Sequence, residues 1–161
     1  MLRPLLLTLL CALGPAAALA QDAAISFGGL KQDTSLPVEV KADSLAVNQA
    51  DGSATFTGNV LVGQGEMRLS AGTVRVEYGQ GGKSIEKLHA TGGVTLASAK
   101  DAAEAREAVY TIASGSVVMT GDVLLTQGAS AISGQKLVID LKAGTGRMEG
   151  GVSTIFMPGG N

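Results

Sequence analysis

The chain has 161 residues, which is enough for one domain and short for two. It contains 23 Gly, no Trp, 2 Tyr and 3 Phe against 45% hydrophobic residues, so its core must be built from aliphatic side chains. Twelve Lys and Arg against 14 Asp and Glu give a net charge of −2, which argues against a nucleic-acid partner held by phosphate neutralisation. One His and one Cys do not make the usual zinc site, and a Ser-His-Asp triad would depend on His89 alone. Composition therefore favours binding, transport or a structural role over catalysis, with no metal and no cofactor implied.

The first twenty residues have the pattern of a secretory signal peptide. Arg3 precedes an apolar run from Leu5 to Leu13, and Ala18-Leu19-Ala20 has the small-x-small form of a cleavage site. The run is too short to cross a bilayer comfortably, since a spanning helix takes about 20 apolar residues, and Pro15 interrupts it, so an uncleaved membrane anchor is the less favoured alternative. We therefore predict that residues 1–20 are cleaved on export. The mature chain would then contain no cysteine, because Cys11 lies in the predicted signal peptide.

The remainder divides into three parts by its hydrophobic pattern. Residues 21–36 show no clear period, and we expect them to form a flexible leader. Residues 37–157 alternate apolar and polar side chains almost throughout, which predicts strands. Residues 158–161 read Pro-Gly-Gly-Asn and are expected to form a disordered tail.

Four segments of the central part share a Gly that is followed two residues later by Val. The glycines are Gly58, Gly92, Gly121 and Gly150, at spacings of 34, 29 and 29 residues. Apolar residues two before and two or four after each Gly fall into columns, and positions that differ by two share one face of a strand. Four strands are therefore predicted to turn an apolar stripe to the same side. The large residues of the stripe are Phe56, Val60, Val62, Val94, Leu96, Met119, Val123, Leu125, Met148 and Val152.

A second strand lies upstream of each repeated Gly, with its own alternating apolar residues. Turns that contain Gly52, Gly115 and Gly144 separate the two strands of three units, as expected where a hairpin needs positive φ. The segment from Ala102 to Ala108 consists of strong helix formers, but the register of the residues after it predicts a strand over 104–112. The alternating residues of these second strands are Leu45, Val47, Val74, Val76, Tyr78, Tyr110, Ile112, Leu137, Ile139 and Leu141.

Stacking such strand pairs leaves either a closed dry core or an open trough lined with aliphatic side chains. The same residues serve both interpretations. The shortage of large aromatics, and the small Ala90 and Thr154 at column positions, favour a trough with room inside.

The repeated motif resembles a known family. Ala42-Asp43-Ser44-Leu45-Ala46-Val47, a Gly turn and then Thr55-Phe56-Thr57-Gly58-Asn59-Val60-Leu61-Val62 resemble the OstA-like family of lipopolysaccharide transport proteins. The motif returns from Val118 to Gly128, and the resemblance covers roughly residues 38–156. It implies a twisted β-jellyroll, open at its ends, whose apolar interior shields the acyl chains of lipid A. It also implies end-to-end self-association, and partners among the inner-membrane and outer-membrane lipopolysaccharide transport components.

The resemblance is closest to the short periplasmic member of the family, since an outer-membrane translocon would continue into a long barrel and an inner-membrane member would keep its N-terminal span. The predicted lipid-binding interior consists of the column residues and the alternating residues from Val74 onward. Lys41, Arg68 and Arg75 are either solvated or contacts for lipid phosphates, and His89 falls in the outward register. The rival hypothesis is a secreted structural or adhesive β-solenoid with a closed core, which would bind no lipid.

Overall fold

The structure is a computed structural model that describes residues 23–26 and 28–158. The predicted signal peptide, residues 1–20, and the predicted tail after Pro158 lie outside the described residues. The described strands form one 13-stranded sheet in which every pairing is antiparallel, so the prediction of an all-β fold is confirmed. In chain order the elements are β1 (Ala23–Ser26), the 3-10 turn η1 (Gly28–Leu30), β2 (Glu39–Lys41), β3 (Ser44–Asn48), β4 (Ser53–Gln64), β5 (Met67–Tyr78), β6 (Ile85–Thr91), β7 (Val94–Ser98), β8 (Asp101–Ala105), β9 (Glu107–Thr111), β10 (Ser116–Gln127), β11 (Ser130–Asp140), β12 (Thr145–Glu149) and β13 (Ser153–Ile155).

The repeated Gly marks a bend in the middle of each strand pair. In β4 the ladder to β5 shifts register between Thr57 and Val60, and Gly58 and Asn59 there have φ angles of 83° and 46°. Gly121 and Asp122 repeat this bend in β10, with φ angles of 86° and 47°. Two successive left-handed residues form a bulge that turns the strand sharply. Period-two alternation does not reveal such a bend, because the residues on either side of it still point inward.

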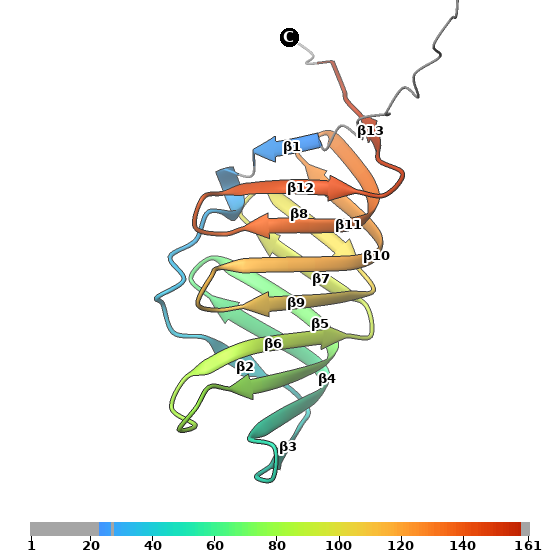
Figure 1. Ribbon diagram of the computed structural model, residues 1–161. Coiled ribbons are helices and arrows are strands. Elements are labelled where there is room, and N and C mark those ends of the chain that lie inside the picture. Colours follow the sequence, from blue (N-terminus) through green and yellow to red (C-terminus); the bar gives the residue numbers. More distant parts are fainter. Residues whose placement is uncertain (1–22, 27, 159–161) are drawn as a thin grey trace, which may run out of the picture.

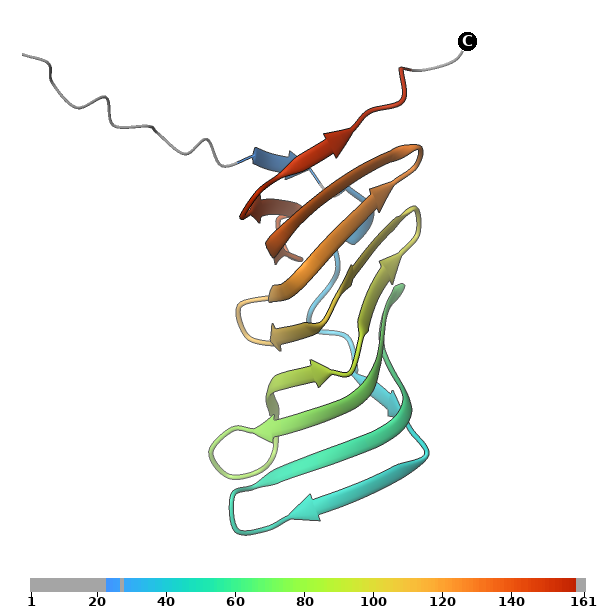
Figure 2. The same ribbon diagram turned by 90° about the vertical axis from the view of Figure 1, so that its right-hand side faces the viewer.

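The bends fold the sheet into two leaflets, which Figure 2 shows as bent strands stacked along the long axis of the molecule. Leaflet one contains β1, β3, β6, β9, β12, the first halves of β4 and β10, and the second halves of β5 and β11. Leaflet two contains β2, β7, β8, β13 and the remaining halves. We call the side opposite the bends the seam. There the turns 79–84, 112–115 and 141–144 of leaflet one face the turns 65–66, 99–100 and 128–129 of leaflet two.

The core lies between the leaflets. It runs from Ala54 and Val76 near β3 to Met148 in β12, and most of its side chains are less than 2% exposed. Such low exposure means that no water-sized space adjoins them, so the two inner faces are in van der Waals contact. At the β3 end the packing is incomplete. Leu45 and Val47, the alternating apolar residues of the first of the predicted second strands, are 55% and 65% exposed because β3 has only β4 as a neighbour.

The segment from Ala102 to Ala108 is extended, as its register predicted. β8 pairs with β7 and β10, and β9 pairs with β6 and β10, with Arg106 between them at the bend. Ladders on both sides satisfy the backbone groups that a short helix would have satisfied locally. Tertiary pairing therefore overrides helix propensity here.

The prediction of a flexible leader over residues 21–36 is wrong for the part that the structure describes. β1 pairs with β12 over four residues, and Leu30 in η1 is fully buried. The following residues run down the seam to β2, at the left of Figure 1 and behind the strands in Figure 2. This order depends on hydrogen bonds to distant turns and on one buried side chain, so no local period announces it.

Candidate functional site

The candidate site is the aliphatic interior between the leaflets. The structure brings together there fourteen buried residues of the predicted interior, and it leaves Phe56 and Ile112 partly buried against them. Leaflet one contributes Val74, Val76, Tyr110, Met119, Leu137, Ile139, Leu141 and Met148, and leaflet two contributes Val60, Val62, Val94, Leu96, Val123 and Leu125. The residues before each repeated Gly therefore belong to one wall, and those after it belong to the other.

Two residues of the predicted interior lie outside it. Tyr78 is 39% exposed, because the β5–β6 ladder is irregular between Glu77 and Tyr78 and the alternation breaks there. Val152 is also 39% exposed and follows Gly150 and Gly151, where the chain lies outside any strand before β13. Tyr78 thus corrects the alternation expected in a second strand, and Val152 corrects the column alignment around the repeated glycines.

The prediction also missed part of the interior. Met67 and Leu69 alternate with exposed residues at the start of β5 and are at most 1% exposed. Leu88 and Val117 are equally buried in β6 and β10. Period-two alternation continued through these strands would have found them. Leu30 has no such signal, because it comes from a turn of 3-10 helix.

A buried polar network lies at the seam. Tyr110 Oη donates to Gln64 Oε1 at 2.6 Å and thereby joins leaflet one to leaflet two. Gln64 Nε2 donates in turn to the carbonyl oxygens of Thr34 at 3.1 Å and Leu36 at 2.9 Å. The Gln64 side chain is therefore satisfied although it is only 1% exposed. Burial raises the pKa of Tyr110 to about 12, although its hydrogen bond to Gln64 opposes the rise.

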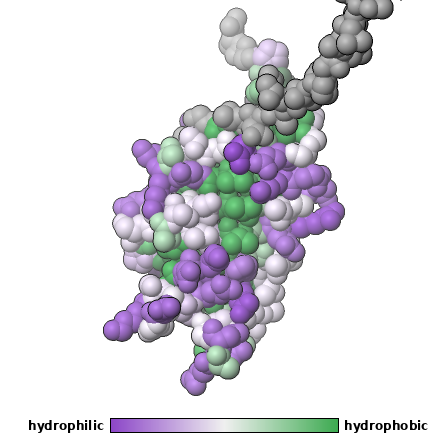
Figure 3. All heavy atoms as spheres, in the orientation of Figure 1, coloured by the Kyte–Doolittle hydropathy of each residue, from purple (hydrophilic) through white to green (hydrophobic). Residues whose placement is uncertain are grey.

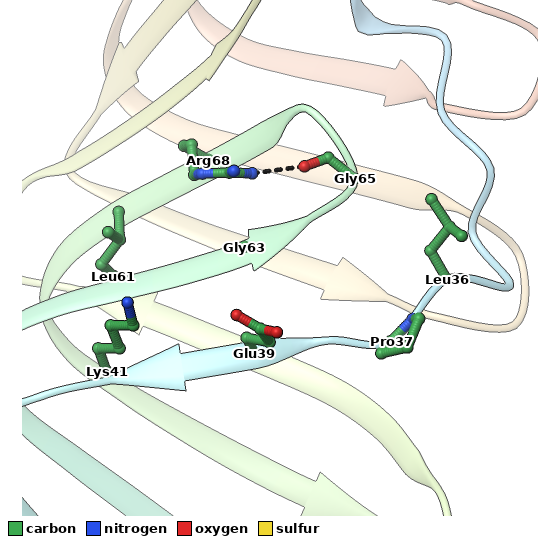
Figure 4. Close-up of a pocket in the computed structure, with 8 residues that line it drawn as sticks. All are labelled: Leu36, Pro37, Glu39, Lys41, Leu61, Gly63, Gly65 and Arg68. Carbon is green, nitrogen blue, oxygen red and sulfur yellow. Dashed lines mark hydrogen bonds between the residues drawn. The ribbon is translucent and has the colours of Figure 1, made fainter.

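Two of the three candidate phosphate contacts share a pocket on leaflet two, where Arg68 lies next to the seam and Lys41, which pairs with Leu61, lies nearer the bend. Lys41 and Arg68 line a shallow pocket of about 360 Å³ on the outer side of leaflet two, which Figure 4 shows between β2 and the β4–β5 turn. Arg68 Nη1 donates to the carbonyl oxygens of Gly65 and Met67 at 2.6 and 2.8 Å. Arg75 lies elsewhere, 3.1 Å from Asp51 and 3.6 Å from Glu77. Carboxylates therefore already offset its charge, which leaves Lys41 and Arg68 as the better candidates.

The outer face of leaflet one is mixed in character. Val109, Val118 and Val138 pair across β9, β10 and β11 and are half-buried. Figure 3 shows an apolar strip flanked by polar and charged residues on this face. His89 neighbours Val109 in the ladder and lies 3.4 Å from Glu77 Oε1, on the outward side as predicted.

Within residues 23–26 and 28–158, no group of three or more His, Cys, Asp or Glu side chains is placed to hold a metal ion. No helix in the described part of the chain is long and apolar enough to cross a membrane.

The structure thus defines a bent antiparallel β-jellyroll with an aliphatic interior and a polar network at its seam. The sequence profile of the family described as "LptA/(LptD N-terminal domain) LPS transport protein" matches residues 39–145. The chain belongs to this family of lipopolysaccharide transport proteins, which are carriers rather than enzymes. The family predicted from the repeated motif is thereby confirmed.

Individual relatives agree with this assignment. An uncharacterised protein of Rhizobium meliloti is 28% identical over 83% of this chain and 76% of its own length. The lipopolysaccharide export system protein LptA of Escherichia coli K12 is 30% identical over 68% of this chain and 63% of its own length. The crystal structure of LptH, described as the LptA-homologous periplasmic component of the lipopolysaccharide transport device of Pseudomonas aeruginosa, superimposes with a TM-score of 0.70. That match covers 79% of this chain and 99% of LptH at 20% identity, so it shows the shared fold.

Proposed function

We propose that this protein carries lipopolysaccharide across the periplasm with its acyl chains held between the two leaflets. The observation that supports this function most strongly is the continuity of the aliphatic interior from the β3 end to β12. Each CH₂ group of an acyl chain is worth about 0.8 kcal/mol when it is withdrawn from water. A lipid with several chains therefore needs such an interior to leave one membrane for another.

The same side chains serve as core and as lining. Val, Leu, Ile and Met contact one another through non-directional dispersion forces, which acyl chains reproduce without a precise fit. Hydrophobic contacts of this kind let a chain slide along the trough, because no single contact fixes its position. The leaflets separate when lipid enters, and they stay joined through the bends.

The polar part of the lipid stays outside the aliphatic interior. Lys41 and Arg68 provide positive charge on the outer side of leaflet two, with Arg68 next to the seam. A lipid phosphate that emerges at the seam comes within reach of Arg68, which suits charge-assisted hydrogen bonding, and Lys41 adds positive charge to the same pocket.

Both ends of the jellyroll are suited to assembly with further copies or with the inner-membrane and outer-membrane components. Among the described strands, β2 and β3 pair only with β4 at one end, and β13 pairs only with β11 at the other. Unpaired strand edges add readily to the sheet of another molecule. Apolar side chains accompany both edges, with Leu45 and Val47 at one end and Ile155, Phe156 and Met157 at the other. The predicted signal peptide and the family support a periplasmic location for this function.

Site-specific photo-crosslinking in cells tests this function. A photoreactive residue at Val94, which is 2% exposed, should become attached to lipopolysaccharide. Its neighbour Thr95 faces outward in β7 and serves as the matched control, which should give no adduct. Absence of adduct at both positions in the folded, secreted protein would refute lipid carriage and favour a solenoid with a permanently closed core.

A further inference from the structure

The segment that crosses the seam contacts both leaflets. We call residues 29–38 the strap. Gln32 contacts both walls, because its backbone N–H donates to the Leu141 carbonyl of leaflet one at 2.8 Å and its Nε2 donates to Ser98 Oγ of leaflet two at 3.0 Å. Further along, the strap carbonyls of Thr34 and Leu36 accept from Gln64. The strap therefore closes the one side of the jellyroll where the leaflets are not joined by backbone.

The attachment of the strap is local. Residues 31–38 lie outside any helix or strand, and four hydrogen bonds made by Gln32 and Gln64 join them to the leaflets. Leu30 is the one strap side chain that is fully buried, whereas Lys31, Asp33 and Leu36 are exposed. Release of the strap would break no strand ladder. Segments with few buried apolar contacts and exposed backbone are the ones that open without global unfolding.

The strap is also tethered at both ends. β1 before it pairs with β12, and β2 after it pairs with β4. A released strap therefore stays next to the seam and can return to it, since its ends remain fixed in the two edge regions of the sheet.

A lipid in the middle of the trough must pass its polar head out through the seam. On the opposite side β4, β5, β10 and β11 run through the bends from one leaflet into the other, and links of one or two residues join β8 to β9 and β6 to β7, so the backbone of the described strands crosses the exit there. The strap occupies the path that the head would take. Its departure would also free the Gln64 amide and the Ser98 hydroxyl, which are buried hydrogen-bonding groups that suit the hydroxyls and amides of a glycolipid head.

We infer that residues 29–38 form a displaceable strap that competes with lipid for the seam, so that lipid occupies the trough only when the strap has left it. This inference rests on the proposed function, because it concerns how the same lipid gains access to the same interior. It explains why a segment without hydrophobic periodicity is ordered by hydrogen bonds to Gln64 and Leu141.

A disulfide can lock the strap in place. A Cβ atom on Gly29 would lie 3.2 Å from Asp101 Cγ, which is one bond of about 1.5 Å from the Asp101 Cβ. The two Cβ atoms are then at most about 4.7 Å apart, close to the span of a disulfide. The variant Gly29→Cys/Asp101→Cys would contain no other cysteine outside the predicted signal peptide.

The test is photo-crosslinking at Val94 in the purified Gly29→Cys/Asp101→Cys protein with lipopolysaccharide, in the oxidised and the reduced form. We expect adduct in the reduced form, and its loss in the oxidised form in proportion to the fraction of disulfide formed. Equal adduct in both forms would overturn the strap and leave lipid carriage intact, since lipid would then load from the ends of the jellyroll. No adduct even in the reduced form, with the protein folded, would refute lipid carriage and the strap with it.

If the cysteine pair prevents folding, a milder pair of variants decides the question. Gln32→Ala removes the side-chain bond to Ser98 and should increase the rate of adduct formation at Val94. Lys31→Ala, at the adjacent exposed position, should leave that rate at the wild-type value. Equal rates of adduct formation for the two variants would refute the inference that the strap is displaced when lipid enters.

Discussion

The assignment of faces in β10 can be tested with two adjacent leucines. Leu125 is fully buried and lies in the ladder between Ala103 and Ile132, whereas Leu124 is 39% exposed and faces outward. Leu125→Ala removes three buried carbons, worth roughly 0.8 kcal/mol each, and leaves a cavity that hydrogen-bonded strands cannot readily close. We expect it to lower the free energy of unfolding by about 3 kcal/mol. Leu124→Ala should cost less than about 1 kcal/mol.

Urea denaturation followed by far-UV circular dichroism measures both variants. For a slope of about 2 kcal/mol per molar urea, the Leu125→Ala midpoint should fall by about 1.5 M, and the Leu124→Ala midpoint by less than about 0.5 M. The slope must be unchanged for this comparison to hold. Equal midpoint shifts for the two variants would refute the placement of the core between the leaflets.

Two further predictions concern the seam and the bends. Because burial raises the pKa of Tyr110 to about 12 while an unfolded Tyr titrates near 10, the folded chain holds a proton that the unfolded chain releases. Stability should therefore fall as the pH rises from about 10 to about 12, by on the order of 2 kcal/mol, and Tyr110→Phe should lack this loss. Gly121→Ala should cost about 2 kcal/mol or more, because φ is +86° there and the new Cβ would lie 2.9 Å from Arg106 Cδ. At Gly128 an added Cβ would meet no atom within 4 Å, and φ is +55°. Gly128→Ala should therefore lower the free energy of unfolding by only about 1 kcal/mol. Urea midpoints across pH and for the two Ala variants measure these effects. An alkaline loss that persists in Tyr110→Phe, or equal costs at the two glycines, would contradict the respective prediction.

The strands and most of the interior follow from the sequence because antiparallel strands keep a period of two. Val60, Val123 and their column neighbours point inward in the structure as that period requires. The sequence shows the repeated glycines but not the bends that they form, because a bend that preserves the inward direction leaves no trace in the alternation. Tyr78 shows the converse, since one irregularity in the ladder was enough to turn a predicted interior residue outward.

The seam could not be predicted in the same way. Gln64 extends the inward register of β4, and nothing nearby in the sequence indicates that its partners are Tyr110 and the carbonyls of Thr34 and Leu36. Contacts of this kind join segments that are 28 to 46 residues apart, and they depend on how the leaflets fold together. Hydrogen bonds between residues far apart in the sequence are therefore the part of the site that only the structure reveals.

The central claim is that acyl chains occupy the space which the core side chains now fill, so the leaflets must move apart to admit them. Spin labels at Thr111 in leaflet one and Thr126 in leaflet two, both near the seam, report that movement, and labels at Ser70 and Thr126 within leaflet two are the control. We predict that lipopolysaccharide lengthens the distance between residues 111 and 126 by several ångströms and leaves the distance between residues 70 and 126 unchanged. Bound lipopolysaccharide with both distances unchanged would show that lipid sits outside the leaflets and would contradict the account.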